Sequence, residues 1–396
     1  MRKTQLLNKV VTLSVAALVL AGCGGGSSSS SATPGGKPYA GPVGDGEGAI
    51  SILAWPGYAE NGSTDPNVDW VTPFEKETGC KATIKTFGTS DEAVSLMQGG
   101  GYDVVSASGD ATLRLIYGDL VQPVNTDLVP SYADIFSGLK DQKFNSVDGQ
   151  MYGIPHGRGA NLLAYNPKVV TTAPDSWGVT FDPASPYAGK VTAYDSPIFI
   201  ADAALYLMNT KPELGIKDPY ALDQTQFDAA MALLEQQKPI IGEYWGDYLK
   251  NIDAMKNGTT VLGTTWQVNL NYANADGEVV KAVLPKEGAT GWSDTWMVAK
   301  DTKNINCSYK WLDWIAGPTA NAQVAEWFGE APSNSKACAL ITDKTFCDTY
   351  HAADEAFWNN VYFWNTPSEK CIDGRTDVKC VPYAEWSKAW SSLRNG

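Results

Sequence analysis

Short apolar segments alternate with amphipathic segments along the first third of the chain. Apolar and β-branched residues predict strands over 49–55, 81–87 and 102–108. Apolar residues at helical spacing predict helices over 68–79, 89–100 and 110–119. This alternation is typical of a largely parallel, doubly wound sheet, so we expect an α/β fold.

A similar alternation resumes after a Gly-containing stretch over 152–166, which indicates a second unit. Further strands are expected over 189–195, 259–266 and 279–285, and further helices over 200–209, 226–237, 307–317 and 320–329. The sequence shows no internal repeat. At 396 residues the chain is long enough for two domains.

Residues 1–22 have the pattern of an export signal. The basic residues Arg2, Lys3 and Lys9 precede an apolar stretch over 10–22. This stretch is too short for an ordinary transmembrane helix. The stretch ends in "LAGC", which resembles the lipobox of bacterial lipoproteins and implies cleavage before Cys23 and a lipid on its sulfur. The Gly/Ser-rich segment 23–48 would then be a flexible tether to a membrane. A plain secretory signal with an incidental cysteine is the alternative.

The net charge of the chain limits which kinds of partner are expected. The chain has a formal charge of −14, and loss of a leader with three basic residues brings it near −17. Nucleic acid is therefore not an expected partner, because phosphate binding needs clustered Lys and Arg. An acidic surface suits a protein that attracts cations.

Six cysteines remain when Cys23 is set aside, and an even number in an exported chain indicates disulfides. Two pairs flank short loops suited to local bridges, which leaves the last two for each other, although six cysteines allow fifteen pairings. The pairs expected are Cys80–Cys307, Cys338–Cys347 and Cys371–Cys380. No metal site is expected, because C-x₂-C spacing is absent and histidine is scarce.

Enzyme motifs are absent. The sequence contains no nucleophile elbow, zinc-protease motif, phosphate-binding loop or dinucleotide fingerprint, so no cofactor is expected. An exported hydrolase would have to rely on His156, His351 or a pair of carboxylates, and neither histidine has a recognisable setting. Catalysis is therefore the weaker interpretation.

Aromatic residues are abundant, with 14 Trp and 18 Tyr. Trp55 and Trp266 lie at the carboxyl ends of expected strands, as do the polar residues Ser108 and Asp195, and Asp110 follows shortly after one. Ligands bind outside such strand ends in open α/β sheets. In "GWSDTW" (291–296), one residue separates Asp294 from a Trp on either side. Flat aromatic faces with isolated carboxylates suit an organic cation, while core packing is the alternative for each residue.

Several motifs carry a resemblance to one family. They are "ILAWPGY", "WVTPFEKETGC", "YDVVSASGDATLRLI", "YGIPHGRGANLLAYN", "AYDSPIFIADAAL", "LPKEGATGWSDTWMV" and "EWFGEAPSN". From Ala49 onward the chain resembles the substrate-binding proteins of bacterial ABC importers, and more narrowly the spermidine/putrescine-binding family. The "PKEG" motif followed by Trp-x-Asp is the most specific of these signals.

The resemblance implies a two-lobed, type II periplasmic binding protein-like fold with the ligand in the hinge cleft. One lobe would comprise 49–157 and 293–335, and the other 158–292 and 336–396. The chain would pass between the lobes near Arg158–Gly159, near Trp292–Asp294, and between Pro332 and Cys338.

The resemblance also implies the site. Its residues are Trp55, Tyr58, Ser108, Asp110, Arg158, Asp195, Trp266, Trp292, Asp294 and Glu330. Trp55 would cover the ligand, Trp266 and Trp292 would form aromatic walls, and Asp294 and Asp195 would accept ammonium groups. Glu330 lies where the family often places a Tyr.

The chain also departs from the family pattern. Pro56-Gly57 stands where the family commonly has Thr-Glu, and Asp110 replaces a Tyr. Ile198 stands near the position of the family's second acid in the second lobe, and Arg158 replaces an aromatic residue. Arg158 would suit a ligand carboxylate. In the alternative it pairs with Asp110 or Glu330 and only shapes the hinge.

The expected protein is therefore a monomeric solute receptor, anchored to a membrane, that delivers a small aliphatic amine to the membrane subunits of an ABC importer. A zwitterion such as 4-aminobutyrate is the alternative ligand. An exported hydrolase and a purely structural surface lipoprotein are the alternatives from other classes.

Overall fold

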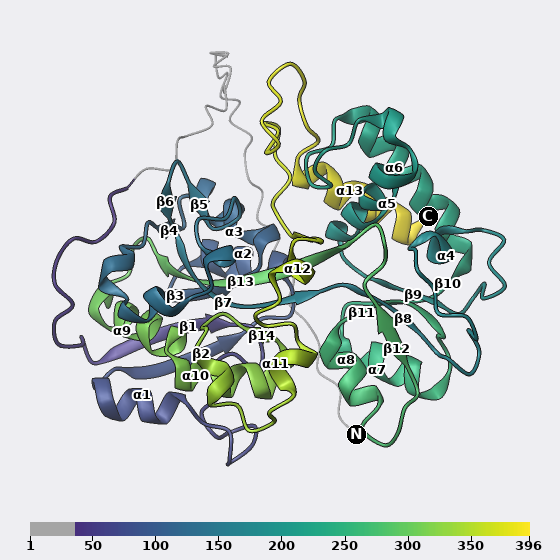
Figure 1. Ribbon diagram of the computed structural model, residues 1–396. Helices are drawn as coiled ribbons and strands as arrows, with labels where there is room; N and C mark the ends of the chain where they lie inside the picture. Colours follow the sequence, from purple (N-terminus) through teal and green to yellow (C-terminus); the bar gives the residue numbers. More distant parts are fainter. Residues whose placement is uncertain (1–35) are drawn as a thin grey trace, which may run out of the picture. The chain divides into compact units, whose positions relative to one another are not determined.

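The computed structural model describes residues 36–396, so the expected signal peptide, Cys23 and the start of the tether lie outside the described residues. The described chain forms two main sheets (Figure 1). The larger has eight strands, with the path β14-β7-β13-β3-β1-β2 and with β4 and β15 also paired to β13. The smaller has five strands in the order β10-β9-β11-β8-β12. We call the parts built on them the first and second lobes.

The first lobe begins with the expected strand–helix alternation. Its parallel strands are β1 (Ala49–Ala54), β2 (Lys81–Thr86) and β3 (Val104–Ala107). Its helices are α1 (Val71–Thr78), α2 (Ser90–Gly99) and α3 (Gly109–Tyr117). The Thr89 side chain caps α2 by accepting the Glu92 N–H, and left-handed Gly79 ends α1. The predicted α/β fold is confirmed.

The second lobe has a mixed sheet. Its strands are β8 (Leu162–Tyr165), β9 (Val191–Tyr194), β10 (Ile241–Trp245), β11 (Leu262–Thr265) and β12 (Lys281–Val283). Its helices are α4 (Gly178–Phe181), α5 (Ile200–Thr210), α6 (Gln224–Gln237), α7 (Tyr248–Asn257) and α8 (Gln267–Ala273). The apolar face of α5, rich in Ala and Leu, lies in the core of this lobe.

Two long antiparallel strands link the lobes. β7 (Gly153–Ala160) leaves the larger sheet and leads through Asn161 into β8, while β12 precedes β13 (Ala289–Ala299), which returns to the larger sheet (Figure 1). Side chains alternate between the two faces of each strand, because successive residues of a strand point to opposite faces, except at the irregularity where the register shifts between Asp294 and Thr295. The two strands therefore decide which side chains enter the region between the sheets.

The remaining elements complete both lobes. They are β4 (Val121–Gln122), the hairpin β5 (Ser146–Val147) and β6 (Gln150–Met151), α9 (Ile305–Ala316), α10 (Pro318–Val324), a π-helical turn (Ala325–Gly329), β14 (Ala331–Pro332), α11 (Phe346–Thr349), α12 (Glu355–Trp358), β15 (Val361–Phe363) and α13 (Tyr383–Asn395). Short 3₁₀ turns occur at Thr126–Leu128, Pro130–Asp134, Ser137–Leu139, Pro197–Phe199, Pro212–Leu214, Lys238–Ile240 and Ala337–Ala339.

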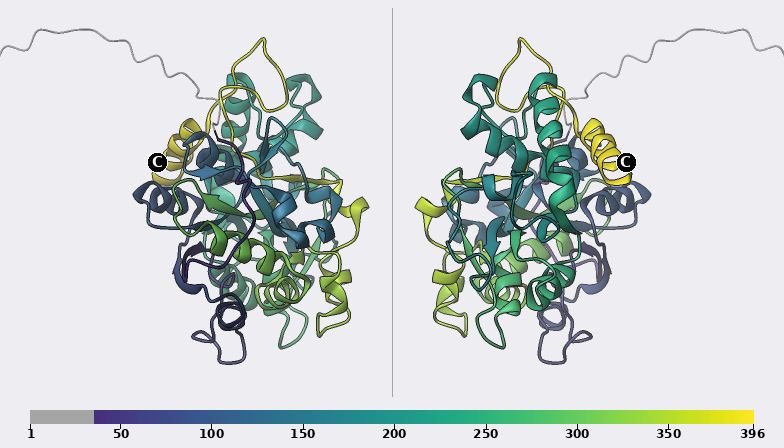
Figure 2. Two further views of the ribbon diagram at one scale, coloured as in Figure 1. Left: turned by 90° about the vertical axis from the view of Figure 1, so that its left-hand side faces the viewer. Right: turned by 90° about the vertical axis from the view of Figure 1, so that its right-hand side faces the viewer.

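The C-terminal segment enters the core of the second lobe after β15. β15 pairs in parallel with the start of β13 in the larger sheet, whereas α13, yellow in Figure 2, packs with Trp364 in the core of the second lobe. Ile341 and Phe346 already share an apolar cluster with Leu162 and Leu270 of the second lobe, so the passage expected over Pro332–Cys338 stays a prediction.

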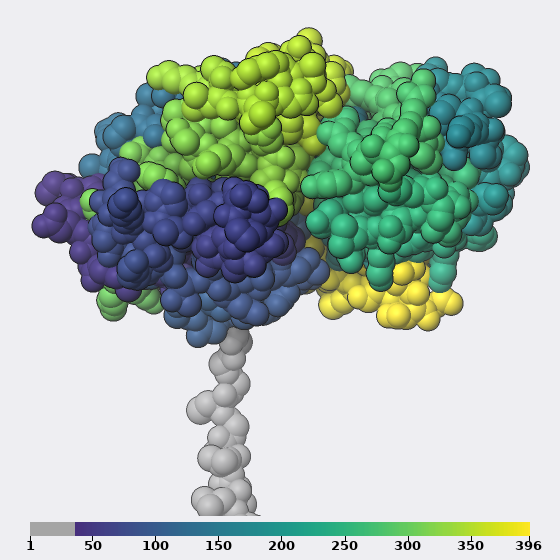
Figure 3. Space-filling model, turned by 90° about the horizontal axis from the view of Figure 1, so that it is seen from below, coloured from purple at the N-terminus to yellow at the C-terminus, as the bar shows by residue number. Residues whose placement is uncertain are grey.

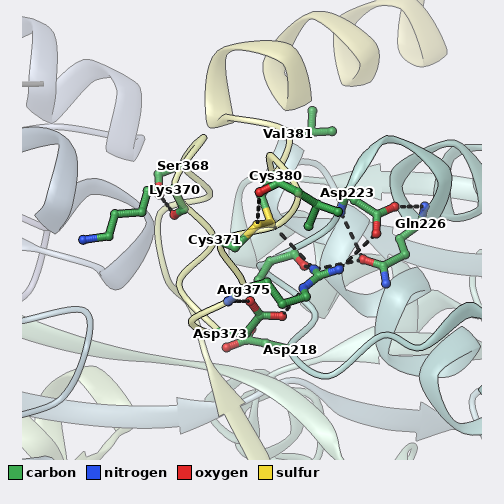
Figure 4. Close-up of a disulfide and its surroundings, with 12 residues drawn as sticks. Asp218, Asp223, Gln226, Ser368, Lys370, Cys371, Asp373, Arg375, Cys380 and Val381 are labelled. Atoms are coloured by element: carbon green, nitrogen blue, oxygen red, sulfur yellow. Dashed lines mark hydrogen bonds and ion pairs between the residues drawn. A yellow bond between two sulfur atoms is a disulfide. The ribbon is translucent and has the colours of Figure 1, made fainter. Parts of the chain in front are cut away.

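Three disulfides join the cysteines in the pairs that the sequence suggested: Cys80–Cys307, Cys338–Cys347 and Cys371–Cys380. The loop closed by the last pair is fixed on α6. Arg375 donates to Asp373 Oδ2 at 2.7 Å and to Asp223 Oδ2 at 3.0 Å, and Asp223 caps α6 (Figure 4).

The described part of the expected tether is not free. The Glu47 carboxylate accepts the backbone N–H groups of Asn306 and Cys307 at 2.9 Å each, where negative charge stabilises the start of α9. The Tyr39 ring packs at 5.7 Å from that of Tyr309. These contacts hold residues 39–47 against the first lobe. Within residues 36–396, no helix has the length and apolarity needed to cross a membrane.

Candidate functional site

Two buried carboxylates meet at one tyrosine hydroxyl. Asp294 on β13 and Glu330 before β14 are 3% and 0% exposed. The Tyr58 Oη lies 2.7 Å from Asp294 Oδ2 and 2.9 Å from Glu330 Oε2. A phenol has one proton to donate, so it satisfies only one of these contacts and the other needs a proton on a carboxyl group. The pair is therefore suited to take up positive charge.

The glycines of β7 make room for these groups. Gly157 and Gly159 lie opposite Asp294 and Trp292 in the β7–β13 ladder. A Cβ on Gly157 would collide with the Glu330 carboxyl group, and a Cβ on Gly159 would collide with the Trp292 ring. Alternate glycines thus open the face of β7 that points toward the site.

A third acid lies close by. Asp110, in the first turn of α3, is 2% exposed and accepts the Ser90 hydroxyl at 2.9 Å. Burial raises the pKa of Asp110 to about 6. Burial also raises the pKa of Asp294 to about 6, with the Asp110 charge adding to the effect and the Ser108 and Tyr58 hydroxyls opposing it. Burial and the Asp294 charge raise the pKa of Glu330 well above its ordinary value.

No Lys or Arg within the described residues forms an ion pair with this cluster, although the charge of Arg114, which pairs with Asp91, partly offsets the effect of burial on the pKa of Asp110. Of the ion pairs within residues 36–396, none includes Asp294 or Asp110. His156 Nε2 lies 3.5 Å from Glu330 Oε1, but burial lowers the pKa of this histidine to about 3 and leaves it neutral. Buried carboxylates without a partner are costly, so a cation from outside the chain would be strongly stabilised here.

Aromatic rings surround the acids. Tyr194, at the end of β9, stacks on Trp364 with 5.5 Å between ring centroids, and burial raises its pKa, with the charges of Asp110 and Asp294 adding to the effect. The Trp292 and Trp266 rings meet edge to face at 6.1 Å. Faces of this kind suit methylene groups and ammonium groups.

Phe328 closes one side of the acid pair. Its ring lies 4.7 Å from that of Tyr58 and 6.0 Å from that of Trp292. It also lines a groove of about 690 Å³ between the lobes. In Figure 3, the blue-purple surface of the first lobe borders the green surface that includes α7 and α8. The groove is lined by Pro56, Gly57, Glu60, Thr64, Thr86, Tyr248, Leu249, Ile252, Asp253, Lys256, Trp266, Val268, Tyr272, Ala275, Trp327 and Phe328.

Most of the residues expected at the site lie at or beside this cluster. Tyr58, Ser108, Asp110, Asp294 and Glu330 form or touch the acid cluster, and Trp266 and Trp292 stand in its aromatic surround. Trp55 packs at 4.5 Å from Phe87, next to the groove residues Pro56 and Gly57.

Arg158 lies on the opposite face of β7, because the glycines on either side of it take the ligand-facing positions. Its Nη2 donates to the Ala352 carbonyl at 3.0 Å and lies 3.6 Å from Glu355 Oε1. Its guanidinium carbon stands 4.3 Å from the centre of the Trp358 ring. The expected ligand contact is therefore corrected, and so are the alternative partners Asp110 and Glu330: Arg158 ties β7 to the segment 352–358.

Asp195 is also occupied by the chain. Its Oδ1 accepts the Trp390 Nε1–H and the Arg394 Nε–H at 3.0 Å each, and its Oδ2 accepts from Arg394 Nη2 at 3.1 Å. Both donors belong to α13. The expected ammonium acceptor is thus corrected to a residue that binds the C-terminal helix to the second lobe.

Three contributors escaped the sequence reasoning. Tyr194 directly precedes Asp195 at a strand end, so the strand-end rule that selected Asp195 could also have selected its neighbour. Phe328 lies in a segment predicted as a helix, where an aromatic residue is usually core. Trp364 lies directly after β15, and no local sequence pattern predicts that β15 pairs with β13. In the described chain, no three His, Cys, Asp or Glu side chains are placed so that they could hold a metal ion together.

Comparison with known proteins assigns the family. Residues 69–352 match the family described as "Bacterial extracellular solute-binding protein", which is more than half of the chain. The chain belongs to this family. Its function is accordingly to bind a solute outside the cytoplasm rather than to catalyse a reaction.

This solute-binding protein is similar to polyamine-binding relatives at low identity. It is 25% identical over 345 residues to the putrescine-binding periplasmic protein SpuD of Pseudomonas aeruginosa, covering 83% of this chain and 89% of that protein. The spermidine/putrescine-binding protein PotD of Streptococcus pneumoniae aligns with a TM-score of 0.66 at 21% identity, covering 87% and 97% of the two chains. The structure of the Atu4243 GABA receptor aligns with a TM-score of 0.63 at 18% identity, covering 87% of this chain and 97% of that chain. The last two likenesses show the fold.

Proposed function

We propose that the protein captures a small aliphatic diamine or polyamine and delivers it to an ABC importer. The observation that carries the proposal is the cluster of Asp110, Asp294 and Glu330, buried without an ion pair to any Lys or Arg of the described chain. Similarity to proteins named for putrescine and spermidine binding supports the same ligand class.

Binding would exchange protons for ammonium groups. Asp294 Oδ1 and Glu330 Oε1 have no hydrogen-bond partner among the described residues, and ammonium N–H groups would satisfy them. The methylene chain would lie against Tyr194, Trp266 and Trp292. Because the acids come from the first lobe and Tyr194 and Trp266 from the second, a bound amine would stabilise the state in which the lobes meet.

A zwitterion such as 4-aminobutyrate fits less well. Its carboxylate would need a cationic partner, and both Arg158, which was expected in that role, and Arg394 are engaged elsewhere. Arg158 binds the segment 352–358, and Arg394 binds Asp195. A diamine needs no such partner.

A lipid anchor at Cys23 remains part of the proposal, since that residue lies outside the described chain. The lipid would hold the receptor at the membrane that contains the importer. The docking of Tyr39 and Glu47 on the first lobe would leave the segment before Gly36 as the link.

Titration calorimetry on residues 36–396 tests the ligand class. We expect tight binding of putrescine or spermidine and little heat with 4-aminobutyrate. Asp294→Asn should weaken amine binding by about 100-fold or more, because removing one side of a buried charged pair costs several kcal/mol. Selective binding of 4-aminobutyrate, or amine affinity unchanged in Asp294→Asn, would refute the proposal.

A further inference from the structure

A chain of hydrogen bonds runs from the site wall into the core of the second lobe. Trp266 Nε1 donates to Asn161 Oδ1 at 2.8 Å. Asn161 Nδ2 donates to Thr290 Oγ1 at 2.7 Å, and the Thr290 hydroxyl donates to Asp202 Oδ2 at 3.0 Å. Asn161, Thr290 and Asp202 are 0%, 0% and 3% exposed. We propose that these three residues form a relay that positions the Trp266 indole as a wall of the ligand site, an inference that rests on the proposed function.

The directions of the first two bonds in the relay follow from its first member. An indole N–H can only donate, so Asn161 must present its oxygen to Trp266 and its NH₂ group to Thr290. The Thr290 oxygen therefore accepts, and its own proton must point to another acceptor. Asp202 Oδ2 is that acceptor, which explains why an acid lies in the first turn of a helix that is otherwise apolar on its buried face.

The relay is anchored where the chain passes between the sheets. Asn161 separates β7 from β8, and Thr290 is the second residue of β13. The Asn161 backbone N–H also donates to the Thr290 carbonyl at 2.8 Å. The two middle members therefore have fixed backbones, and the Trp266 ring is held relative to the linking strands.

Trp266 has few other means of holding its orientation. It is half-buried, it follows β11, and it lines the groove. Its ring meets Trp245 edge to face at 4.9 Å and Tyr194 at a tilt at 5.5 Å, and both contacts tolerate rotation of the indole. The bond to Asn161 is its one side-chain hydrogen bond in the described structure. A cation–π contact depends on how the Trp266 ring is oriented toward the ammonium group, so loss of the relay should weaken amine binding.

A double-mutant cycle separates positioning from plain stability. Thr290→Val removes the hydroxyl at constant shape, Thr290→Ser retains it, and Trp266→Phe removes the indole N–H. We expect Thr290→Val to weaken putrescine binding about tenfold, Thr290→Ser to restore most of it, and Thr290→Val to have little further effect on affinity when Trp266→Phe is already present. Equal effects of Thr290→Val on affinity with and without Trp266→Phe would overturn the proposal.

A second measurement requires neither a ligand nor a variant at Thr290. The Trp266 Nε1–H signal, assigned by its absence in Trp266→Phe, should exchange slowly with solvent in the wild-type protein although the residue is only partly buried. Fast exchange would overturn the relay. If no amine binds the wild-type protein while this signal is protected, the proposed ligand class fails but the relay stands, so the two failures are distinguishable.

Discussion

At the scale of single residues, the acids of the site lower the stability of the unliganded protein. Asp294 gives up its hydration on folding and receives two hydroxyl contacts but no cation. Its pKa rises from the model-peptide range near 3.8 to about 6 in the folded chain. The folded state therefore binds more protons than the unfolded state between these values, and stability falls as the pH rises through this window.

We accordingly expect Asp294→Asn to bind amines poorly and yet to melt higher than the wild type, by a few degrees at pH 8. The amide carries no charge to bury, so the advantage should shrink toward pH 4, where the carboxyl group is protonated in the folded state and partly protonated in the unfolded state. Thermal melts of both proteins at pH 4 and pH 8 check this. A variant that melts lower at pH 8 would show that the carboxylate is already stabilised in the unliganded protein.

Amine affinity should fall as the pH drops below about 6. Asp294 and Asp110 both have pKa values raised to about 6, so at lower pH they hold protons that an ammonium group must displace. Calorimetry at pH 5 and pH 8 should show weaker binding at pH 5, and near pH 6 the heat should vary with the ionisation enthalpy of the buffer. An affinity independent of pH would mean that the ligand does not contact these acids.

Asp195→Asn provides the matched control. This acid is bound by Trp390 and Arg394 on α13. We expect amine affinity within about threefold of the wild type, together with a lower melting temperature, because Arg394 loses its partner. A loss comparable with that of Asp294→Asn would restore Asp195 to the ligand site.

The sequence predicted the ligand-facing acids better than it predicted the two corrected residues. "WSDTW" places an acid among tryptophans in any strand register, so Asp294 could be found locally. Arg158 depended on which face of β7 it occupies, and a shift of one residue exchanges the faces. Gly157 and Gly159 indicate which face of β7 points toward the site, because a side chain at either position would collide with Glu330 or Trp292.

At the scale of elements, the ligand-facing side of β7 should tolerate no side chains. Gly157→Ala would place a methyl group against the Glu330 carboxyl group, so we expect amine affinity to fall about tenfold or more. Gly99→Ala is the control, because a Cβ at the end of α2 meets no neighbouring atoms. Calorimetry with putrescine on both variants tests this prediction. Wild-type affinity in Gly157→Ala would show that the Glu330 carboxyl group does not need the space left by Gly157.

Elements that are formed locally were predicted well, and elements that are formed by distant pairing were not. The helices α1, α2 and α3 follow from helical spacing and caps within their own residues. β15 exists because Val361–Phe363 returns beside residues about 70 positions earlier in the chain. The contribution of Trp364 to the site depends on that return, so it could not be read from its neighbours.

At the scale of the whole molecule, the three disulfides should contribute unequally. Cys80–Cys307 spans 227 residues, whereas Cys371–Cys380 spans 9. In the chain-entropy account, loss of the first would cost roughly 5 kcal/mol and loss of the second roughly 3 kcal/mol. Urea unfolding of the paired Cys→Ser variants should rank them in this order. The reverse order would mean that the contacts of Arg375, rather than loop closure, dominate the stability.

Ligand entry requires the lobes to move apart, because Asp294 and Glu330 are almost wholly shielded while the open groove ends at Phe328. We expect small-angle scattering from residues 36–396 to give a larger radius of gyration without ligand than with saturating putrescine. Asp294→Asn should keep the larger value at the same putrescine concentration, since it lacks the contact that favours closure. If the wild type binds putrescine tightly in calorimetry but its radius of gyration does not change, the amine must enter past Phe328 by a local movement of that ring, and Phe328→Ala should then accelerate its association.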